Sequence, residues 1–187
     1  MNIKLVSSIR KKRKYAIIRW CVFCLLIWAA FIFLTSGTFM KPNLLIPLAL
    51  CISMGEGELA SAAVAIGCGL LSDCAFDKLT GSSAILLLIG CVCASLLFTH
   101  YLQKNFINVF LVTAIFTAFY YLIDFFFCYY IWNYSNHEII FTDYTIISFV
   151  LTSLSLIIIY PVVKLIRKNL TLRKMHVLYE NNALIKD

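Results

Sequence analysis

Long, uninterrupted apolar segments constrain this chain more than any other feature. Residues 16–34, 82–101, 106–131 and 144–164 each approach or exceed the roughly 20 apolar residues that an α-helix needs to cross a bilayer. Apolar residues make up 62% of the chain and charged residues only 13%, a balance that a water-soluble domain does not have. The apolar runs are continuous rather than alternating, which favours helices over barrel strands. The sequence therefore predicts an all-α polytopic membrane protein.

A fifth apolar stretch, residues 42–73, is interrupted in its middle. The tetrapeptide Gly-Glu-Gly-Glu occupies residues 55–58, and two glycines with two glutamates make a poor helix interior and a good turn. We therefore expect two short helices, 42–55 and 58–73, which are either tilted spans or a re-entrant pair. With the four long runs they give about six transmembrane helices, of which the second and third are short.

The distribution of basic residues predicts the topology. Lys/Arg-rich flanks stay cytoplasmic, and such flanks occur at both ends of the chain. The basic residues are Lys4, Arg10, Lys11, Lys12, Arg13, Lys14 and Arg19 before or early in the first span, and Lys164, Arg167, Lys168, Arg173, Lys174 and Lys186 at or after the end of the last. Both termini are thus expected in the cytoplasm, which requires an even number of crossings. Six crossings place Lys104 inside and only Lys41 and Lys78 outside. One membrane domain is expected, with a basic N-terminus 1–15, membrane helices 16–164 and a basic tail 165–187.

No pattern in the sequence indicates catalysis or cofactor binding. Seven of the eight cysteines lie within apolar spans, where we interpret them as buried small apolar residues, and the three histidines do not gather with them into a metal site. Phosphate-binding glycine loops and the motifs of metalloproteases and serine hydrolases are absent from the sequence. We therefore expect no enzyme, no cofactor, no metal and no nucleic-acid partner, and an intramembrane enzyme would lack a paired nucleophile and base.

The predicted helix 58–73 is rich in small residues. Ala63 and Gly67 are four residues apart, as are Ala65 and Gly69. In a bilayer this small-xxx-small spacing lets helix backbones approach closely. The two stripes can serve packing within this chain or docking of a partner helix, and the sequence leaves both alternatives open.

Asp73 ends this helix at the membrane boundary. An ionisable residue there is expected to meet water or to cap a neighbouring helix. The connection to Gly81 is short enough to hold Asp73 near the start of the next helix, whose dipole favours a carboxylate. Ser82 or Ser83 is the expected N-cap of that helix.

The same segment resembles the rod shape-determining protein MreD family. The resemblance consists of the pattern Gly-x-Gly-Leu-x-x-Asp, a short polar turn and a further glycine, carried here by Gly67, Gly69, Leu70, Asp73 and Gly81. The layout is similar as well: a small basic membrane protein of about six helices with little extramembrane mass and a proline-bearing second helix.

The resemblance implies a non-enzymatic role in bacterial cell-wall elongation at the plasma (inner) membrane. MreD-like proteins accompany the bitopic scaffold MreC, the glycan polymerase RodA and a class B penicillin-binding protein. They help to position lateral peptidoglycan synthesis and so maintain cell shape. On this interpretation the partners are these three proteins together with membrane lipid.

A second carboxylate, Asp124, lies inside the predicted span 106–131. With Tyr130 near the outer surface, Asp124 would lie about 9 Å deep at a rise of about 1.5 Å per residue. A charge in lipid is costly, so we expect Asp124 to face the bundle and to hydrogen-bond there or to be protonated. Ion or substrate coupling is the alternative role.

The alternative function is transport, as the substrate-binding membrane component of an energy-coupling-factor vitamin transporter. Such proteins are similar in size and have six helices. They commonly carry an Ala-x-x-x-Ala docking motif on the first helix. Here that helix offers only Ala16, Ala29 and Ala30, whose spacing does not fit.

Overall fold

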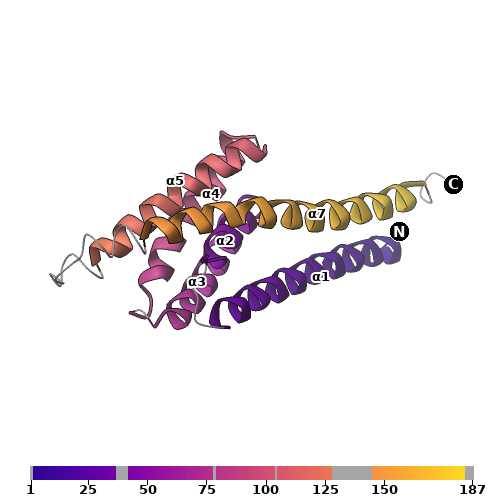
Figure 1. Ribbon diagram of the computed structural model, residues 1–187. Helices are drawn as coiled ribbons and strands as arrows, with labels where there is room; N and C mark the ends of the chain where they lie inside the picture. Colours follow the sequence, from indigo (N-terminus) through magenta and orange to yellow (C-terminus); the bar gives the residue numbers. More distant parts are fainter. Residues whose placement is uncertain (1, 37–41, 78, 104, 128–144, 184–187) are drawn as a thin grey trace, which may run out of the picture. The chain divides into compact units, whose positions relative to one another are not determined.

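The regular secondary structure is entirely helical over the residues that the structure describes. The structure is a computed structural model that describes residues 2–36, 42–77, 79–103, 105–127 and 145–183, with side-chain surroundings for all of these except 2–15 and 170–183. Within that part of the chain there are six α-helices and no β-strand (Figure 1). They are α1 Asn2–Thr35, α2 Leu45–Ser53, α3 Glu58–Ala75, α4 Ser82–His100, α5 Phe106–Phe125 and α7 Ile147–Ala183.

Five of these helices are long and apolar enough to cross a membrane. The apolar stretches are Ala16–Thr35, Glu58–Ala75, Ser82–His100, Phe106–Phe125 and Ile147–Asn169. They confirm that the long apolar runs are helical where the structure describes them and that the protein has the character of a membrane-embedded chain. Residues 128–131 and 144 of the predicted spans fall outside the described residues. The break predicted at residues 55–58 is also confirmed, because α2 ends before it and α3 begins at Glu58.

The expected lengths of the second and third helices need one correction. α3 has 18 residues and is therefore about 27 Å long, close to the thickness of the hydrocarbon core. Only α2 is short: its nine residues rise about 13 Å. The reason is that α3 continues through Asp73 to Ala75, where the side chain of Asp73 finds partners and does not end the helix.

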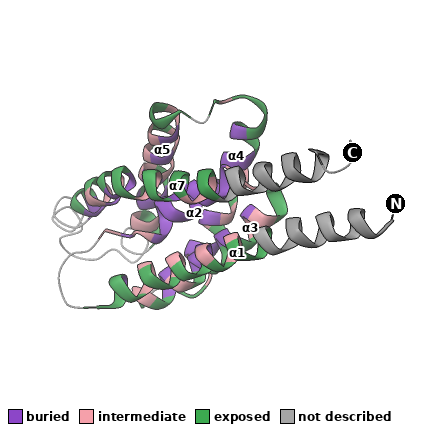
Figure 2. Cartoon of the chain, turned by 90° about the vertical axis from the view of Figure 1, so that its right-hand side faces the viewer, coloured by how far each residue is buried: buried purple, intermediate pink, exposed green. Residues whose placement is uncertain are grey.

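α2 is enclosed by protein along its whole length. All nine of its residues are buried, and it contacts α3, α4 and α5 (Figure 2). Pro47 lies in its first turn, where a missing N–H breaks no hydrogen bond of the helix. A helix that is apolar on every side and covered on every side belongs to the core of the molecule.

α2 runs antiparallel to α3. At its start, the Asn43 side-chain amide donates to Ser72 Oγ (2.8 Å) near the end of α3. At its other end, Ser61 Oγ near the start of α3 donates to the Ser53 carbonyl (3.2 Å). The residues Ser61 and Ser72 are about 16 Å apart along α3. The segment from Asn43 to Ser53 therefore runs along about 16 Å of α3, although only its last nine residues are helical.

The chain divides into two compact units. One is Ile27–Tyr160, which holds α2, α3, α4, α5, the end of α1 and the first part of α7; the other is Met1–Leu26 with Pro161–Asp187. In α7 the division falls at a proline, which removes one backbone hydrogen bond of that helix. α7 continues past residue 164 to Ala183, so the segment predicted as the basic tail begins within a helix.

Candidate functional site

The junction of α3 and α4 is built on one buried carboxylate. Asp73 has no solvent-exposed surface. Its Oδ2 accepts a hydrogen bond from the Gly81 backbone N–H (2.7 Å), and its Oδ1 accepts one from the Ser83 backbone N–H (3.2 Å). These are two of the donors that the first turn of α4 leaves without partners inside the helix. The charge thus lies at the positive end of the α4 dipole, in a geometry that stabilises a carboxylate.

The capping of α4 differs from the prediction. The N-cap residue is Gly81, in the left-handed conformation at φ 103°, and no side chain at that position caps the helix. Ser82 and Ser83 both lie inside the first turn. The position of Asp73, one helix earlier, explains the difference, because its carboxylate takes the role expected of a serine hydroxyl. A glycine fits at residue 81 because it adopts a positive φ without steric cost.

Ser83 connects this junction to α5. Its hydroxyl lies 2.6 Å from the phenol oxygen of Tyr120, and both side chains are buried. Tyr120 in turn packs edge-on against Tyr121, with ring centroids 5.5 Å apart. Consecutive residues of a helix point about 100° apart, so Tyr120 and Tyr121 can contact different helices.

Tyr121 connects α5 to α7 and to the segment before α2. Its phenol oxygen lies 2.9 Å from Thr152 Oγ1, and Thr152 Oγ1 also accepts from the Asn43 backbone N–H (3.1 Å). Asn43 completes the connection to α3 through Ser72, and its Oδ1 accepts from the Leu45 N–H (3.3 Å) at the start of α2.

These residues form the interhelical polar network, which we define as Asn43, Ser72, Asp73, Ser83, Tyr120, Tyr121 and Thr152. Every member is buried. In lipid, hydrogen bonds between helices contribute about 0.6 kcal/mol each on average, and an unpaired polar group is costly. The network therefore fixes the ends of four helices and the entry into α2 relative to one another. It is an arrangement for holding helices in register.

The two small-residue stripes of α3 lie in different surroundings. Ala65 and Gly69 are buried, and a Cβ added at Gly69 would lie 2.3 Å from the Ala84 Cα of α4. The α3 and α4 backbones are therefore in close contact at this point. Ala63, Gly67 and the adjacent Leu70 are exposed. A Cβ added at Gly67 would have no atom within 4 Å among the described residues.

The second carboxylate singled out in the sequence, Asp124, lies on α5. It is the penultimate residue of α5, one helical turn beyond Tyr120, and it is half-buried. The expectation that Asp124 faces the bundle and hydrogen-bonds there stays a prediction. The α-helix has its last residue at Phe125, and residues 126 and 127 continue it as a π-helical turn. Tyr130, the reference for the predicted depth, falls outside the described residues.

The prediction that the cysteines in the spans are buried holds for only some of them. Cys51, Cys68 and Cys91 are buried, whereas Cys21, Cys24 and Cys93 are exposed on apolar helix surfaces. The reason is that the sequence shows which residues lie in a span but not which side of the helix meets protein. In a membrane-spanning helix an exposed cysteine faces lipid as a small apolar residue.

Sequence reasoning missed Asn43, Thr152 and Tyr121. Serine and threonine are unremarkable within apolar spans, and their hydrogen-bond partners lie up to 109 residues away in the chain. Asn43 was the one available signal, because a side-chain amide next to a fully apolar helix must find partners when it is buried.

No family model, no curated protein and no solved structure matches this chain. The similarity to the MreD family therefore rests on the residues between Gly67 and Gly81 and on the layout of the helices. It stays a prediction from the sequence.

Proposed function

We propose that this chain is a non-enzymatic membrane assembly factor of the bacterial wall-elongation machinery, comparable to MreD-like proteins. Three residues of the resemblance, Gly69, Asp73 and Gly81, meet at the α3–α4 junction. Each has a distinct mechanical role there: close backbone contact, capping of α4, and the left-handed turn. A motif whose residues shape a helix junction fits a protein that acts by holding a geometry.

The observation that carries the proposal is the open face of α3. Ala63, Gly67 and Leu70 are exposed on a helix whose other side is packed tightly against α4. Small residues on a membrane helix allow a second helix to approach closely, and this stripe meets none within the described part of the chain. We assign it to a transmembrane helix of a partner protein.

The partner that best fits is the single membrane helix of an MreC-like bitopic scaffold. A RodA-like glycan polymerase and a class B penicillin-binding protein would join the same assembly, in which the chain would help to position lateral peptidoglycan synthesis. These partners follow from the family resemblance. The open face of α3 supplies a surface suited to a transmembrane helix.

The experiment is co-purification with an MreC-like partner. Gly67→Leu should weaken capture of the partner while the variant itself stays folded. The added side chain separates this helix from the partner helix, and its Cβ would have no atom of the described residues within 4 Å. Cys24→Leu, at an exposed small residue of α1, is the matched control and should capture the partner normally. Undiminished capture by Gly67→Leu would remove the support for this docking face.

We further propose six membrane crossings with both termini in the cytoplasm. The five long apolar helices alone would leave the termini on opposite sides. The antiparallel course of α2 along α3 supports counting the segment that contains α2 as a sixth crossing. This arrangement keeps 14 of the 16 basic residues on the cytoplasmic side, with Lys41 and Lys78 outside. Reporter fusions at residues 10 and 175 should both report the cytoplasm. A fusion at residue 175 that reports the outside would overturn the six-crossing topology.

A vitamin-transport role makes a different prediction at Asp124. An assembly factor should tolerate Asp124→Asn, because the amide keeps the shape and a hydrogen-bonding group. Purified protein can be tested for binding of small vitamins, and cell width can be measured in a depletion strain that carries each variant. Tight vitamin binding that Asp124→Asn abolishes, together with normal cell width on depletion, would favour transport over assembly.

A further inference from the structure

Charge is distributed very unevenly between the two compact units of the chain. The unit made of Met1–Leu26 and Pro161–Asp187, which we call the basic unit, holds 13 of the 16 basic residues and only two of the nine acidic residues, Glu180 and Asp187. Its formal net charge is +11, whereas that of Ile27–Tyr160 is −4, which together give the +7 of the whole chain. The excess positive charge of this protein therefore belongs to one unit.

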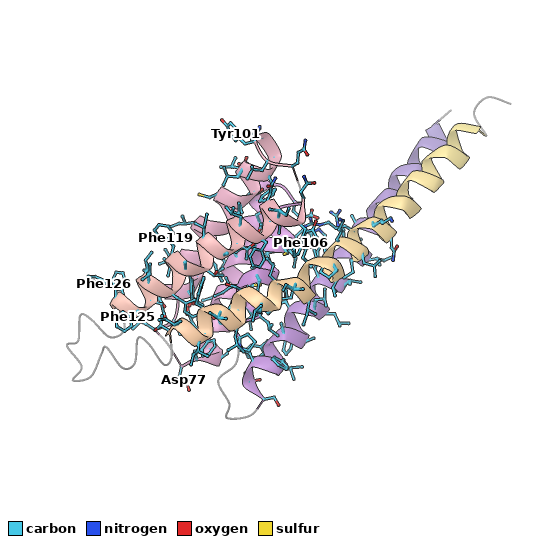
Figure 3. The ribbon with its side chains drawn as sticks, turned by 45° about the horizontal axis from the view of Figure 1, so that its top comes forward. Asp77, Tyr101, Phe106, Phe119, Phe125 and Phe126 are labelled. Atoms are coloured by element: carbon cyan, nitrogen blue, oxygen red, sulfur yellow. The ribbon has the colours of Figure 1, made fainter. Side chains whose placement is uncertain are left out.

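The basic residues are carried on continuous helices, and this fixes their distance from the apolar stretches. α1 extends over Asn2–Thr35 and α7 over Ile147–Ala183, so both helices are longer than their apolar stretches Ala16–Thr35 and Ile147–Asn169 (Figure 3). A helix rises about 1.5 Å per residue, so each position beyond an apolar stretch lies at a set height above its end. A chain segment without helical structure would leave that height open.

Eight basic residues lie within about 9 Å of the end of an apolar stretch. On α1, the five consecutive basic residues 10–14 lie about 3–9 Å before Ala16. On α7, Lys168 lies one residue before Asn169, and Arg173 and Lys174 lie about 6–8 Å beyond it. The headgroup layer of one leaflet is about 5–8 Å thick. Both helices therefore bring basic residues to the depth of the lipid headgroups.

The basic unit does not itself supply carboxylates at this depth. Its two segments belong to one compact unit, so the basic residues of α1 and α7 lie at the same membrane surface. Residues 1–26 and 161–179 include no aspartate or glutamate, and Glu180 lies about 17 Å beyond Asn169 along α7. The anions that a membrane offers at headgroup depth are the phosphate groups of its lipids.

We propose that the basic unit is a binding surface for the headgroups of anionic phospholipids. Clusters of Lys and Arg directly beside a membrane helix attract anionic lipid, and here two helices bring such clusters to one surface. Five consecutive residues at about 100° intervals cover the whole circumference of α1, so lipids can be met on every side of that helix. This surface is independent of the proposed role in wall elongation, because it uses neither the open face of α3 nor any partner protein.

Electron spin resonance of the protein in phosphatidylcholine vesicles tests the proposal. Trace spin-labelled phosphatidylglycerol and phosphatidylcholine are compared by the fraction of each whose motion the protein restricts. We expect wild-type protein to favour phosphatidylglycerol about fivefold or more, the preference that corresponds to one basic residue near a membrane surface. The triple variant Lys168→Gln, Arg173→Gln and Lys174→Gln should lose at least about half of this preference.

The matched control removes the same charge outside the basic unit. Lys41→Gln, Lys78→Gln and Lys104→Gln replace the three basic residues of Ile27–Tyr160 and should leave the preference nearly unchanged. Equal association of the two lipids with wild-type protein, or equal losses in the two triple variants, would overturn the proposal.

A second measurement needs no variant. Raising the salt concentration from about 0.1 M to about 1 M shortens the Debye length from about 10 Å to about 3 Å. The preference of wild-type protein for phosphatidylglycerol should then fall close to one, because charges at the membrane surface are screened. A preference that salt leaves unchanged, or displacement of phosphatidylglycerol by an equimolar single-stranded RNA, would overturn the assignment to lipid headgroups.

Discussion

Gly67 and Gly69 are two residues apart on α3 and carry the same small-residue spacing, but they meet opposite surroundings. At Gly69 the backbone of α4 is so near that a Cβ would lie 2.3 Å from the Ala84 Cα, whereas at Gly67 there is open space. Two residues on a helix are separated by about 200° around its axis, so the stripes lie on nearly opposite sides. One sequence pattern therefore serves two purposes: one side builds the fold and the other is available to a partner.

The comparison shows where the stability of α3 resides. The packed side of the helix includes Gly69 together with Ser72 and Asp73, whose hydrogen bonds reach the start of α4 and the entry into α2. The open side consists of Ala63, Gly67 and Leu70, exposed as a lipid-facing surface is. Substitutions on the packed side should therefore reduce folding, whereas substitutions on the open side should leave folding intact.

The largest effect is expected from Gly69→Leu. Overpacking of a core usually costs about 1–3 kcal/mol, and here the obstacle is a backbone that cannot move aside as a side chain does. We expect little folded protein, measured as the monodisperse fraction in size-exclusion chromatography after detergent extraction.

Gly67→Leu is the matched control for that measurement and should accumulate normally. Similar monodisperse fractions for the two variants would mean that the α3–α4 contact does not limit folding.

A smaller loss is expected from Asp73→Leu. The change leaves the N–H groups of Gly81 and Ser83 without their acceptor, and a buried unsatisfied donor costs about 1–3 kcal/mol. Asp73→Asn keeps one acceptor oxygen and the side-chain shape, so it should lose less stability and retain partner binding and cell shape. Unfolding by a denaturing detergent measures both free energies. An Asn variant as unstable as the Leu variant would contradict the capping role.

The smallest effect in this series is expected from Thr152→Val, which keeps the shape but removes the hydroxyl shared by Tyr121 and Asn43. We expect a loss of about 0.6–1.7 kcal/mol in the same unfolding assay. The neighbouring Ser153→Ala should change stability by less than about 0.5 kcal/mol, because Ser153 Oγ has no hydrogen-bond partner among the described residues. Equal losses at the two positions would argue against the interhelical polar network as the link to α7.

The helices themselves could be predicted from the sequence because hydrophobic length alone determines a span. The turn at residues 55–57 was predictable too, since two glycines and a glutamate interrupt an apolar run. The proximity of Asp73 to the start of α4 followed from the short connection between the helices. These features depend on local composition, which a single sequence displays directly.

Which side of each helix meets protein was not predictable from the sequence. In lipid-embedded helices, apolar residues cover the buried and the exposed sides alike, so no polar–apolar periodicity marks the inward side. The two stripes of α3 therefore looked equivalent, and Cys93 could not be distinguished from Cys91. The contacts of Asn43 and Thr152 join residues 109 positions apart, a pairing that composition does not reveal.

The complete enclosure of α2 has a consequence for the order of events during synthesis. A nine-residue helix is about half the length that the translocon recognises as a span, so α2 cannot be released into lipid by itself. It must wait for the helices that enclose it, and α5 ends 72 residues after α2 does. At roughly 5–20 residues per second, α2 stays uncovered for about 4–14 seconds, during which the translocon or a chaperone must shelter it.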